Sequence, residues 1–487
     1  MINIQYKIHD KYTIEFKIGF NAQREEVINK FSVNTWIFIP YSLDINRATY
    51  PKESFYRDLR SNTRFITPVY LLSEMVHGKA EPLSLLKNAF EKISENPVKE
   101  NIGDYEYNIK MFAAIFKSSL RNQIFYIMDP PVKEEVRHHV LQLAKDIEAI
   151  LREYRSLYRL ISIPTVPREC FDYYLFGDEF MSNIVHKQLF RLVNFLKEKH
   201  LHTYIQVKEN IFKLIEKEVS HRKGRGYPTV EKESTNGNRD LVYRSGALKK
   251  YIESELFLSV KKKKDGALVE QLYYSVAAGI SMIFATAIAF SFQMRFGSFT
   301  IPLFVALVVS YMLKDRIKEL SRYYFAHKMK EKYFDNKTSI SINEHTIGLS
   351  KEGVDFIKNN MVPADVLRIR NRTPLLEADN RYTEEKILLY RKLMELNREQ
   401  LDLNSEYYIS GINEILRFNL SSYLLKMDDP DVPLYILNQD GSYQEITGSK
   451  VYYLNFVIQL KYKLFESFKR YRVVFNRTGI IEVEELL

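Results

Sequence analysis

The sequence predicts a membrane-anchored α+β protein, in which a two-helix transmembrane hairpin joins a mainly helical N-terminal cytosolic domain to a C-terminal α+β cytosolic domain. Two long apolar runs near the middle of the chain, residues 272–292 and 296–313, indicate the hairpin. Alternating apolar residues at the start of the chain indicate that the N-terminal domain begins with a β-hairpin. A helical pattern followed by several short strand patterns indicates the C-terminal α+β domain.

The N-terminal segment, residues 1–45, is expected to be rich in β-strands. Every second residue at its start is apolar, namely Ile2, Ile4, Tyr6 and Ile8. The same alternation returns at residues 12–18, and a third strand is expected at residues 33–39. A period of two is typical of strands with one buried face, so the first two strands are expected to form a hairpin.

The next part of the chain, residues 46–222, is expected to form a helical bundle. Its clearest helix covers residues 132–161, where apolar residues recur at intervals of three and four. Several such helices joined by short connections are typical of a bundle. Residues 223–240 are rich in glycine and poor in apolar residues, so we expect a flexible linker there. Residues 241–270 are expected to form a juxtamembrane helix that leads into the first apolar run.

The transmembrane hairpin is expected at residues 271–313. Residues 272–292 contain no Asp, Glu, Lys, Arg, His or Pro, and at about 1.5 Å per residue they match the roughly 30 Å hydrocarbon core of a bilayer. The second run is weaker, because Pro302 leaves a strictly apolar core of about 20 Å at residues 301–313. The alternative is a hairpin buried in a large soluble core, which the length of the first run disfavours.

Basic residues flank the two apolar runs and predict their orientation. The basic residues closest before the first run are Lys261, Lys262, Lys263 and Lys264. Seven more lie between Lys314 and Lys332, within a basic juxtamembrane helix expected at residues 314–340, whereas the connection holds only Arg295. Because basic flanks stay in the cytoplasm, both termini are expected there, with two spans in the inner (cytoplasmic) membrane. The same residues are expected to contact the lipid bilayer through anionic headgroups.

A seam of small residues marks one side of the first apolar run. Its members lie four residues apart, namely Ala277, Ser281, Ala285 and Ala289. Small residues at this spacing let two helices approach closely. Packing within the hairpin is the preferred use of the seam, and self-association into a homo-oligomer is the alternative.

The C-terminal part, residues 341–487, is expected to be an α+β domain. A helix is predicted at residues 384–403, with Thr383 as its cap and two acidic residues in its first turn. Short strands are expected over most of residues 415–483, and Asp440 with Gly441 is expected to form a hairpin turn.

Composition excludes several classes of partner and compartment. The chain has 487 residues, a formal net charge of +10 and a single cysteine, Cys170. One cysteine allows no intrachain disulfide, so a reducing compartment is expected. No nucleic-acid-binding motif is recognised and the basic flanks explain much of the charge, so no nucleic-acid partner is expected. The absence of charged residues within the apolar runs argues against a carrier or a charge-lined pore.

Three Glu-x-x-His pairs are the candidates for a metal site, because this spacing places both side chains on one face of a helix. They are Glu74 with His77, Glu135 with His138, and Glu218 with His221. Glu135 and His138 are retained as the metal candidates, although their charged neighbours favour a solvated surface. Asp178 and Glu179 lack the spacing of a calcium loop. No cofactor is expected, because no cofactor-binding motif is recognised.

The pattern as a whole favours a membrane-anchored scaffold, sensor or interaction protein. This interpretation depends on the anchor and on the lack of a recognisable catalytic motif. The alternative is a membrane-tethered enzyme, metal-dependent or not, that acts on a lipid or a nucleotide.

Overall fold

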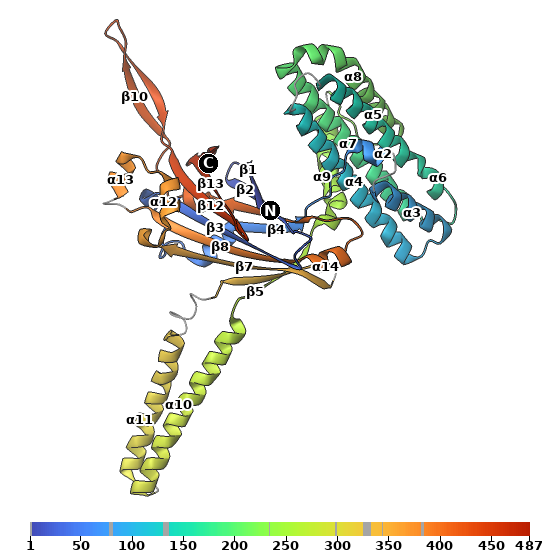
Figure 1. Cartoon of the computed structure of the whole chain (residues 1–487). Helices are drawn as coiled ribbons and strands as arrows, with labels where there is room; N and C mark the ends of the chain where they lie inside the picture. The colour runs from blue at the N-terminus through green and yellow to red at the C-terminus, as the bar shows by residue number, and fades with distance from the viewer. Residues whose placement is uncertain are drawn as a thin grey trace. The chain divides into compact units, whose positions relative to one another are not determined.

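The computed structural model describes residues 2–76, 81–129, 136–232, 234–297, 300–324, 333–342, 344–380 and 384–487. The chain forms two compact units. The sheet unit comprises Met1–Asn62, Ser259–Leu401 and Asn413–Leu487, and the helical unit comprises Thr63–Leu258 and Asp402–Ile412. Figure 1 shows the strands and helices of both units.

An eight-stranded antiparallel sheet forms the main layer of the sheet unit, in the order β14-β13-β12-β3-β8-β7-β6-β5. Its strands are β3 (Ile28–Ile39), β5 (Ser259–Lys264), β6 (Asn336–Ile342), β7 (His345–Ile357), β8 (Lys386–Asn397), β12 (Tyr452–Tyr462), β13 (Phe465–Asn476) and β14 (Gly479–Glu485). The N-terminal strand β3 pairs with β12 on one side and with β8 on the other. Residues from both ends of the sequence therefore share one sheet.

A four-stranded sheet, in the order β1-β2-β9-β4, forms a second layer. Its strands are β1 (Ile2–Asp10), β2 (Thr13–Asn21), β9 (Gly411–Asn419) and β4 (Leu59–Phe65). β1 and β2 pair from Ile2 opposite Phe20 to Asp10 opposite Thr13, which is the hairpin predicted for the start of the chain.

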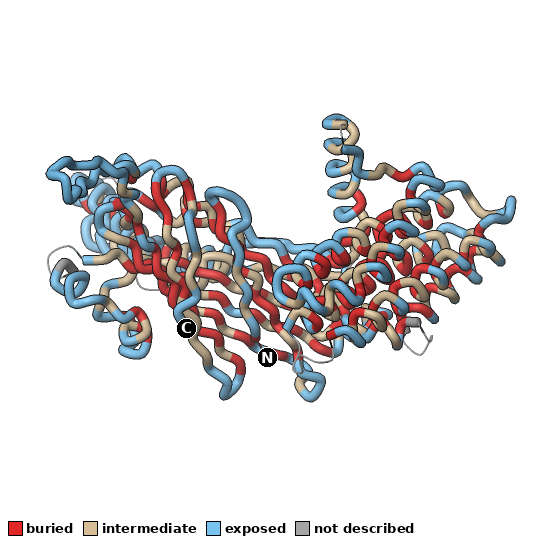
Figure 2. The backbone as a smooth tube through the Cα atoms, turned by 90° about the horizontal axis from the view of Figure 1, so that it is seen from above, coloured by how far each residue is buried: buried red, intermediate tan, exposed pale blue. Residues whose placement is uncertain are grey.

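Aromatic side chains fill the space between the two sheets. The ring of Phe16 on β2 lies 5.4 Å from that of Phe456 on β12 and 5.5 Å from that of Tyr471 on β13. On the opposite face of the large sheet, Trp36 packs with Val366 of α12 (Ala364–Arg370). Both faces of the central strands are therefore buried, and Figure 2 shows the buried residues along neighbouring strands.

The predicted helix at residues 384–403 is wrong, because residues 386–397 form β8. Buried side chains alternate along most of this strand, as expected for a half-buried strand. Lys392 occupies one of the inward positions, where a charged residue breaks the apolar alternation. The helix prediction relied instead on Thr383 as a cap and on the two acidic residues that follow it. The helix that follows, α14 (Arg398–Leu403), is short.

The helical unit consists of eight helices among its described residues. They are α2 (Leu72–Val76), α3 (Glu81–Glu95), α4 (Lys99–Met128), α5 (Val136–Ser156), α6 (Tyr158–Ile161), α7 (Arg168–Lys199), α8 (Leu201–Gly224) and α9 (Thr235–Ile252). The rings of Tyr154 and Tyr174 stack at 5.1 Å between α5 and α7, and the Tyr154 hydroxyl donates to the carbonyl of Tyr174. Gly177 lets these helices meet, because a Cβ there would lie 2.4 Å from the Tyr154 hydroxyl.

The region expected to hold a linker and a juxtamembrane helix contains other elements. α9 begins within the expected linker, where the hydroxyl of Ser234 accepts a hydrogen bond from the amide of Gly237 and caps the helix. After a short 3₁₀ turn (Ser254–Leu256), residues 259–264 form the edge strand β5 in place of a helix.

Two antiparallel helices extend from the sheet unit, α10 (Ala267–Phe296) and α11 (Ile301–Tyr324), and pack side by side (Figure 1). Ala277 and Ser281 of α10 are buried in this contact, as are Ala306 and Ser310 of α11.

The expected two-helix transmembrane hairpin, with two spans, is a wrong prediction. Among the described residues only α10 is long and apolar enough to cross a membrane, with a mean hydropathy of 1.9 over its most apolar window. α11 is charged over its C-terminal half, and its apolar part, about 20 Å long, is shorter than a bilayer core. The fold is therefore α+β with one candidate membrane-crossing helix and a large sheet. Residues 325–332, in the expected basic helix, lie outside the described residues.

The remaining strands and α-helices among the described residues lie in the sheet unit. β10 (Asp431–Leu437) and β11 (Tyr443–Ser449) form a two-stranded sheet of their own, seen as a long projecting hairpin in Figure 1. The short helices are α1 (Lys52–Asp58), α13 (Pro374–Asn380) and α15 (Ser421–Leu424).

The close approach of α5 and α7 predicts opposite effects for two glycine substitutions. Gly177→Ala should lower the free energy of unfolding of the helical unit by about 1–3 kcal/mol, because the new methyl group overlaps Tyr154. Gly103→Ala on α4 has open space around it and should raise that free energy by about 0.5–1 kcal/mol. Thermal loss of the circular dichroism signal at 222 nm measures both, and equal shifts would contradict this packing.

Candidate functional site

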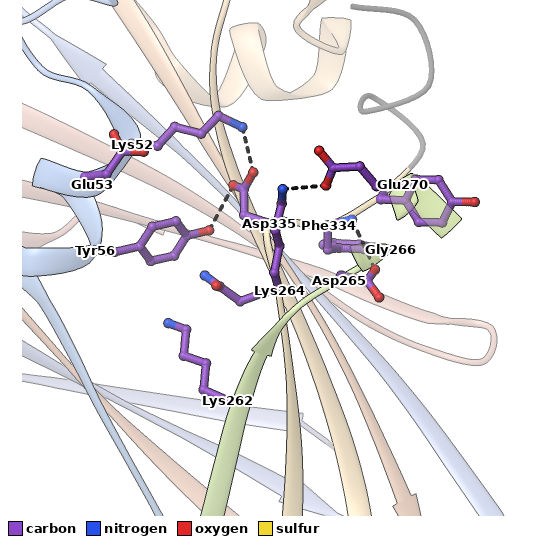
Figure 3. Close-up of a pocket in the computed structure, with 12 residues that line it drawn as sticks. Lys52, Glu53, Tyr56, Lys262, Lys264, Asp265, Gly266, Glu270, Phe334 and Asp335 are labelled. Atoms are coloured by element: carbon purple, nitrogen blue, oxygen red, sulfur yellow. Dashed lines mark hydrogen bonds and ion pairs between the residues drawn. The ribbon is translucent and has the colours of Figure 1, made fainter. Parts of the chain in front are cut away.

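A pocket of about 410 Å³ lies where β5 leads into α10 and where the chain returns to β6 (Figure 3). All of its lining residues belong to the sheet unit. They are Lys52, Glu53, Tyr56, Lys262, Lys264, Asp265, Gly266, Glu270, Tyr333, Phe334, Asp335 and Asn336. We call this pocket, at the base of the two helices, the junction pocket.

Gly266 makes the turn between β5 and α10. Its φ of 70° is in the left-handed region, which favours glycine. A Cβ at this position would also lie 2.9 Å from the ring of Tyr333. Only two residues, Asp265 and Gly266, therefore separate the edge strand from the candidate membrane-crossing helix.

Asp265 joins the outgoing connection to the returning one. Its carboxylate accepts a hydrogen bond from the amide of Phe334 at 3.3 Å, and its own amide donates to the carbonyl of Asp335 at 3.3 Å. Lys351 of β7 lies 3.5 Å from the same carboxylate. Both ends of the α10–α11 segment are thereby bound to each other and to the sheet.

Asp335 holds α1 and β7 at the pocket. One carboxylate oxygen accepts a hydrogen bond from the amine of Lys52 at 2.8 Å. The other accepts from the hydroxyl of Tyr56 at 3.0 Å and from the amide of Val354 at 2.8 Å. Figure 3 shows Lys52 and Tyr56 converging on this carboxylate.

The lysines of β5 alternate between two faces of the strand. Lys262 binds Glu352 at 2.5 Å and lies 4.7 Å above the ring of Tyr56. Lys264 binds Glu270, in the first turn of α10, at 2.5 Å. The alternation of a strand places Lys261 and Lys263 on the opposite face, where both are exposed.

A chain of ionised groups continues from the pocket into the core between the two sheets. Glu352 of β7 accepts a hydrogen bond from the hydroxyl of Tyr390 at 2.9 Å and lies 3.7 Å from the amine of Lys392. Lys392 also binds Glu414 of β9, and Glu414 accepts a hydrogen bond from the hydroxyl of Ser61. Only 3% of Lys392 and 1% of Glu414 are exposed, so this pair is buried between the sheets.

We call this chain of groups the ionic network, and it consists of Asp335, Tyr56, Lys262, Glu352, Lys392 and Glu414. Burial alone would raise the pKa of Glu352, but Lys392 and Lys262 together hold that pKa below its ordinary value. Burial and the carboxylate of Asp335 raise the pKa of Tyr56, so this hydroxyl stays protonated and donates. The two lysines and Lys52, which binds Asp335, together match the three carboxylates, and these contacts favour holding structure over acid–base chemistry.

Of the two predicted metal candidates, only His138 lies within the described residues. His138 is exposed on α5 with its ring 6.1 Å from that of His139, and Glu135 lies outside the described residues. Across the part of the chain that the structure describes, no group of three or more His, Cys, Asp or Glu side chains could hold a metal ion.

Glu218 and His221, the Glu-x-x-His pair on α8, contribute to a buried ion cluster. Arg155 of α5 donates to both carboxylate oxygens of Glu218, at 2.8 and 2.9 Å, and to Asp178 of α7 at 2.8 Å. His221 lies 2.7 Å from the other oxygen of Asp178. Burial would raise the pKa of Asp178, yet His221 and Arg155 hold it below its ordinary value. The cluster joins three helices through charge pairs.

The predicted small-residue seam lies along α11. Ala277 and Ser281 are buried, Ala285 and Ala289 are half-buried, and the hydroxyl of Ser310 donates to the carbonyl of Ala285 at 3.1 Å. The structure therefore brings these residues into the contact within one chain.

Sequence reasoning missed most of the junction pocket and the ionic network. Their residues come from α1, β5, β7, β8, β9 and the segment before β6, which are far apart in the sequence. The one local signal was Lys392, a single charge at an inward position of an otherwise alternating strand.

Removing the buried cation should destabilise the sheet unit strongly. Lys392→Met leaves Glu352 and Glu414 buried without their shared lysine, so the free energy of unfolding should fall by about 3–5 kcal/mol. The control is Lys30→Met, which removes an exposed ion pair with Glu395 on the neighbouring strand. This variant should change the free energy of unfolding by less than about 0.5 kcal/mol. Urea unfolding followed by fluorescence of the single tryptophan, Trp36, reports on this unit alone.

Equal losses for the two variants would contradict the assigned role of Lys392. A double variant, Lys392→Met with Glu414→Gln, should recover part of the loss, because it also removes one of the unpaired charges.

Comparisons with known proteins identify no family for this chain. No protein-family model matches it, and no curated protein matches it. Among solved structures, it is similar to a de novo designed 16-helix transmembrane nanopore solved by cryo-EM, with 11% sequence identity and a TM-score of 0.14, over 53% of this chain and 95% of that chain. Because that TM-score is so low, the similarity does not bear on fold or function.

Proposed function

We propose that this protein is a membrane-anchored sensor or interaction protein, in which α10 holds the chain in a lipid bilayer and the junction pocket relays the state of the anchor to the sheet unit. The observation that carries the proposal is the exposed apolar surface of α10. Only 11% of its most apolar window is buried, although the mean hydropathy of that window is 1.9.

Water is a poor environment for such a helix. Each Å² of apolar surface left in water costs about 25 cal/mol, and soluble proteins rarely expose continuous apolar patches of more than a few hundred Å². Exposed apolar residues follow one another along α10, including Leu272, Val276, Ile280 and Ile283. α11 packs along the same helix and adds exposed Phe304 to this surface. Lipid is the environment that removes this cost.

Basic side chains near the base of the helices support contact with anionic headgroups. Lys261 and Lys263 are exposed on the face of β5 opposite the junction pocket. On α11, Arg322 lies beside the start of α10, with its guanidinium 5.3 Å from the centre of the Tyr274 ring. Each lysine or arginine close to an anionic surface contributes about 1 kcal/mol to binding.

The sensing part of the proposal depends on how tightly α10 is connected to the sheet. Lys264 of β5 binds Glu270 of α10 across the two-residue turn, so tilting the helix pulls on the edge strand. Asp265 transmits the same movement to the returning segment at Phe334. Asp335 and the ionic network then extend the contact to the core between the sheets.

Charges placed on the lipid-facing side of α10 should release the protein from membranes. Ile280→Lys with Ile283→Lys places two lysines near the middle of the helix, at a cost of roughly 5–7 kcal/mol in a bilayer. The matched control is Val242→Lys with Tyr243→Lys on α9, where side chains are at least as exposed. The measurement is the fraction of each variant that remains in the membrane pellet after alkaline carbonate extraction.

We expect the α10 variant to move to the supernatant and the α9 variant to stay with the membrane. If wild-type protein is extracted like the α10 variant, or stays monodisperse without detergent, α10 is not an anchor.

The proposed relay predicts that bilayer thickness changes the rate of amide hydrogen exchange near the β5 edge of the large sheet. Amides of β6 and β7 in wild-type protein should exchange hydrogen at different rates in nanodiscs of thin and thick lipid, because the tilt of a membrane helix follows thickness. Asp335→Asn weakens the bonds to Lys52 and Tyr56 and should abolish the difference. Asp428→Asn, which removes an exposed pair with Lys450, is the control and should leave it unchanged.

A wild-type protein whose β6 and β7 exchange at the same rate in both lipids would refute the relay while leaving the anchor intact. So would an Asp335→Asn variant that keeps the full difference.

A further inference from the structure

The β10–β11 hairpin is an exposed two-stranded sheet without a covering layer. All seven residues of β10 are exposed, and so are six of the seven in β11. A two-stranded hairpin on its own is at best marginally stable in water. Large apolar side chains nevertheless lie on it, among them Leu434, Tyr435, Ile436, Leu437, Tyr443 and Ile446. This combination indicates that further strands add to the hairpin.

The hydrogen bonds at its two ends determine which residues face outward. At the tip, the amide of Asn438 donates to the carbonyl of Ser442 at 2.8 Å, and at the base the amide of Lys450 donates to the carbonyl of Pro430 at 2.7 Å. Hydrogen-bonded and non-hydrogen-bonded pairs alternate along an antiparallel ladder. Pairs that involve residues 431, 433, 435 and 437 of β10 are therefore non-hydrogen-bonded, and the backbone groups of these residues point away from β11.

The outer edge of β10 is blocked by Pro433. This residue belongs to the outward-facing set, and proline has no amide hydrogen to donate to an added strand. On β11 the outward-facing residues are Tyr443, Glu445, Thr447 and Ser449, all of which keep their amides. The hairpin therefore has one closed edge and one open edge.

We propose that a second copy of this chain adds to the open edge, so that two β11 strands pair antiparallel about a two-fold axis at Ile446. Outward-facing residues must pair with outward-facing residues, and Ile446 is the middle residue of β11. With the axis at Ile446 all seven residues of both strands overlap, and Glu445 lies opposite Thr447 of the second copy. Moving the axis by one residue, to Glu445, shortens the overlap and places two glutamates opposite each other, which is destabilising.

The proposed register also continues the apolar surface across the dimer. Leu434 is opposite Ile446 within one hairpin, so their side chains share a face. Pairing at Ile446 places the two isoleucines side by side and gives an uninterrupted row from Leu434 of one copy to Leu434 of the other. Leu434 also leans over Gly448, where a Cβ would lie 2.7 Å from its Cδ1 atom. A four-stranded sheet with such a row meets the size that isolated sheets need.

This inference does not depend on the membrane anchor. The hairpin belongs to the sheet unit, and its open edge follows from its own hydrogen bonds and from Pro433. A second copy is favoured over an unrelated extended peptide, because pairing at Ile446 overlaps all seven residues of both strands and places no like charges directly opposite each other.

A cysteine at the proposed axis should cross-link the two copies. Ile446→Cys places two thiols opposite each other in a non-hydrogen-bonded pair, whose Cβ atoms lie about 4.5–5.5 Å apart. In Gln444→Cys the two thiols would be roughly 13 Å apart, because they are offset by four residues. The chain has one other cysteine, Cys170, which is buried. Full-length protein in detergent is oxidised with copper phenanthroline and separated on a non-reducing gel.

We expect a covalent dimer with Ile446→Cys, and neither with Gln444→Cys nor with wild-type protein. Equal cross-linking at both positions, or none at Ile446→Cys, would overturn the proposal.

A second pair of variants tests the edge without cross-linking. Glu445→Pro removes an outward-facing amide from β11, whereas Tyr435→Pro removes one from the opposite residue on the blocked edge. By light scattering in detergent, Glu445→Pro should be monomeric and Tyr435→Pro should stay dimeric like wild-type protein. A dimer that survives Glu445→Pro would place self-association on another surface, such as the helix pair, and reject the open edge.

Discussion

The buried contact between Lys392 and Glu414 is the interaction on which the sheet unit depends. Lys392 belongs to the eight-stranded sheet and Glu414 to the four-stranded sheet, so the contact spans the space between the two sheets. Removing two charges from water costs several kcal/mol each, and only good geometry with further hydrogen bonds offsets that cost. Glu352 beside the lysine and Ser61 beside the glutamate provide partners, and only the Oε2 atom of Glu414 in this pair is left without one. This polar contact therefore fixes how the two sheets align, in addition to the less specific packing of their aromatic rings.

The same network reaches the surface at the junction pocket, next to α10. An apolar helix held by a flexible linker would move independently of the protein it anchors. Here the connection is a two-residue turn. Glu270 after the turn binds Lys264 of β5, and Asp265 within the turn accepts a hydrogen bond from the returning segment at Phe334. Because Asp335 joins three segments at once, a shift at the base of the helices changes several partly buried contacts together. This arrangement suits a protein that responds to its anchor.

Local patterns in the sequence predicted the elements whose partners are close in the chain. The alternation from Ile2 to Ile8 predicted the first hairpin, and the uncharged run at residues 272–292 predicted the core of α10. Prediction failed where distant contacts decide the structure. β8 was predicted as a helix. Lys392 hides the alternation of this strand in the sequence, because its inward position depends on Glu414 in another sheet. The second span failed because the apolar part of α11 is too short. The junction pocket could not be predicted, since no local pattern relates Lys52 to Asp335.

The outer edges of the eight-stranded and two-stranded sheets differ in how they resist added strands. β5 at one edge of the large sheet carries four consecutive lysines, and β14 at the other edge carries several glutamates. Charged side chains on edge strands prevent unwanted pairing, and Pro433 does the same on β10. β11 differs, because it has no proline and only one charged residue, Glu445. An edge left open beside three protected ones is better explained by a partner strand than by chance exposure, since an unprotected edge in water would favour aggregation.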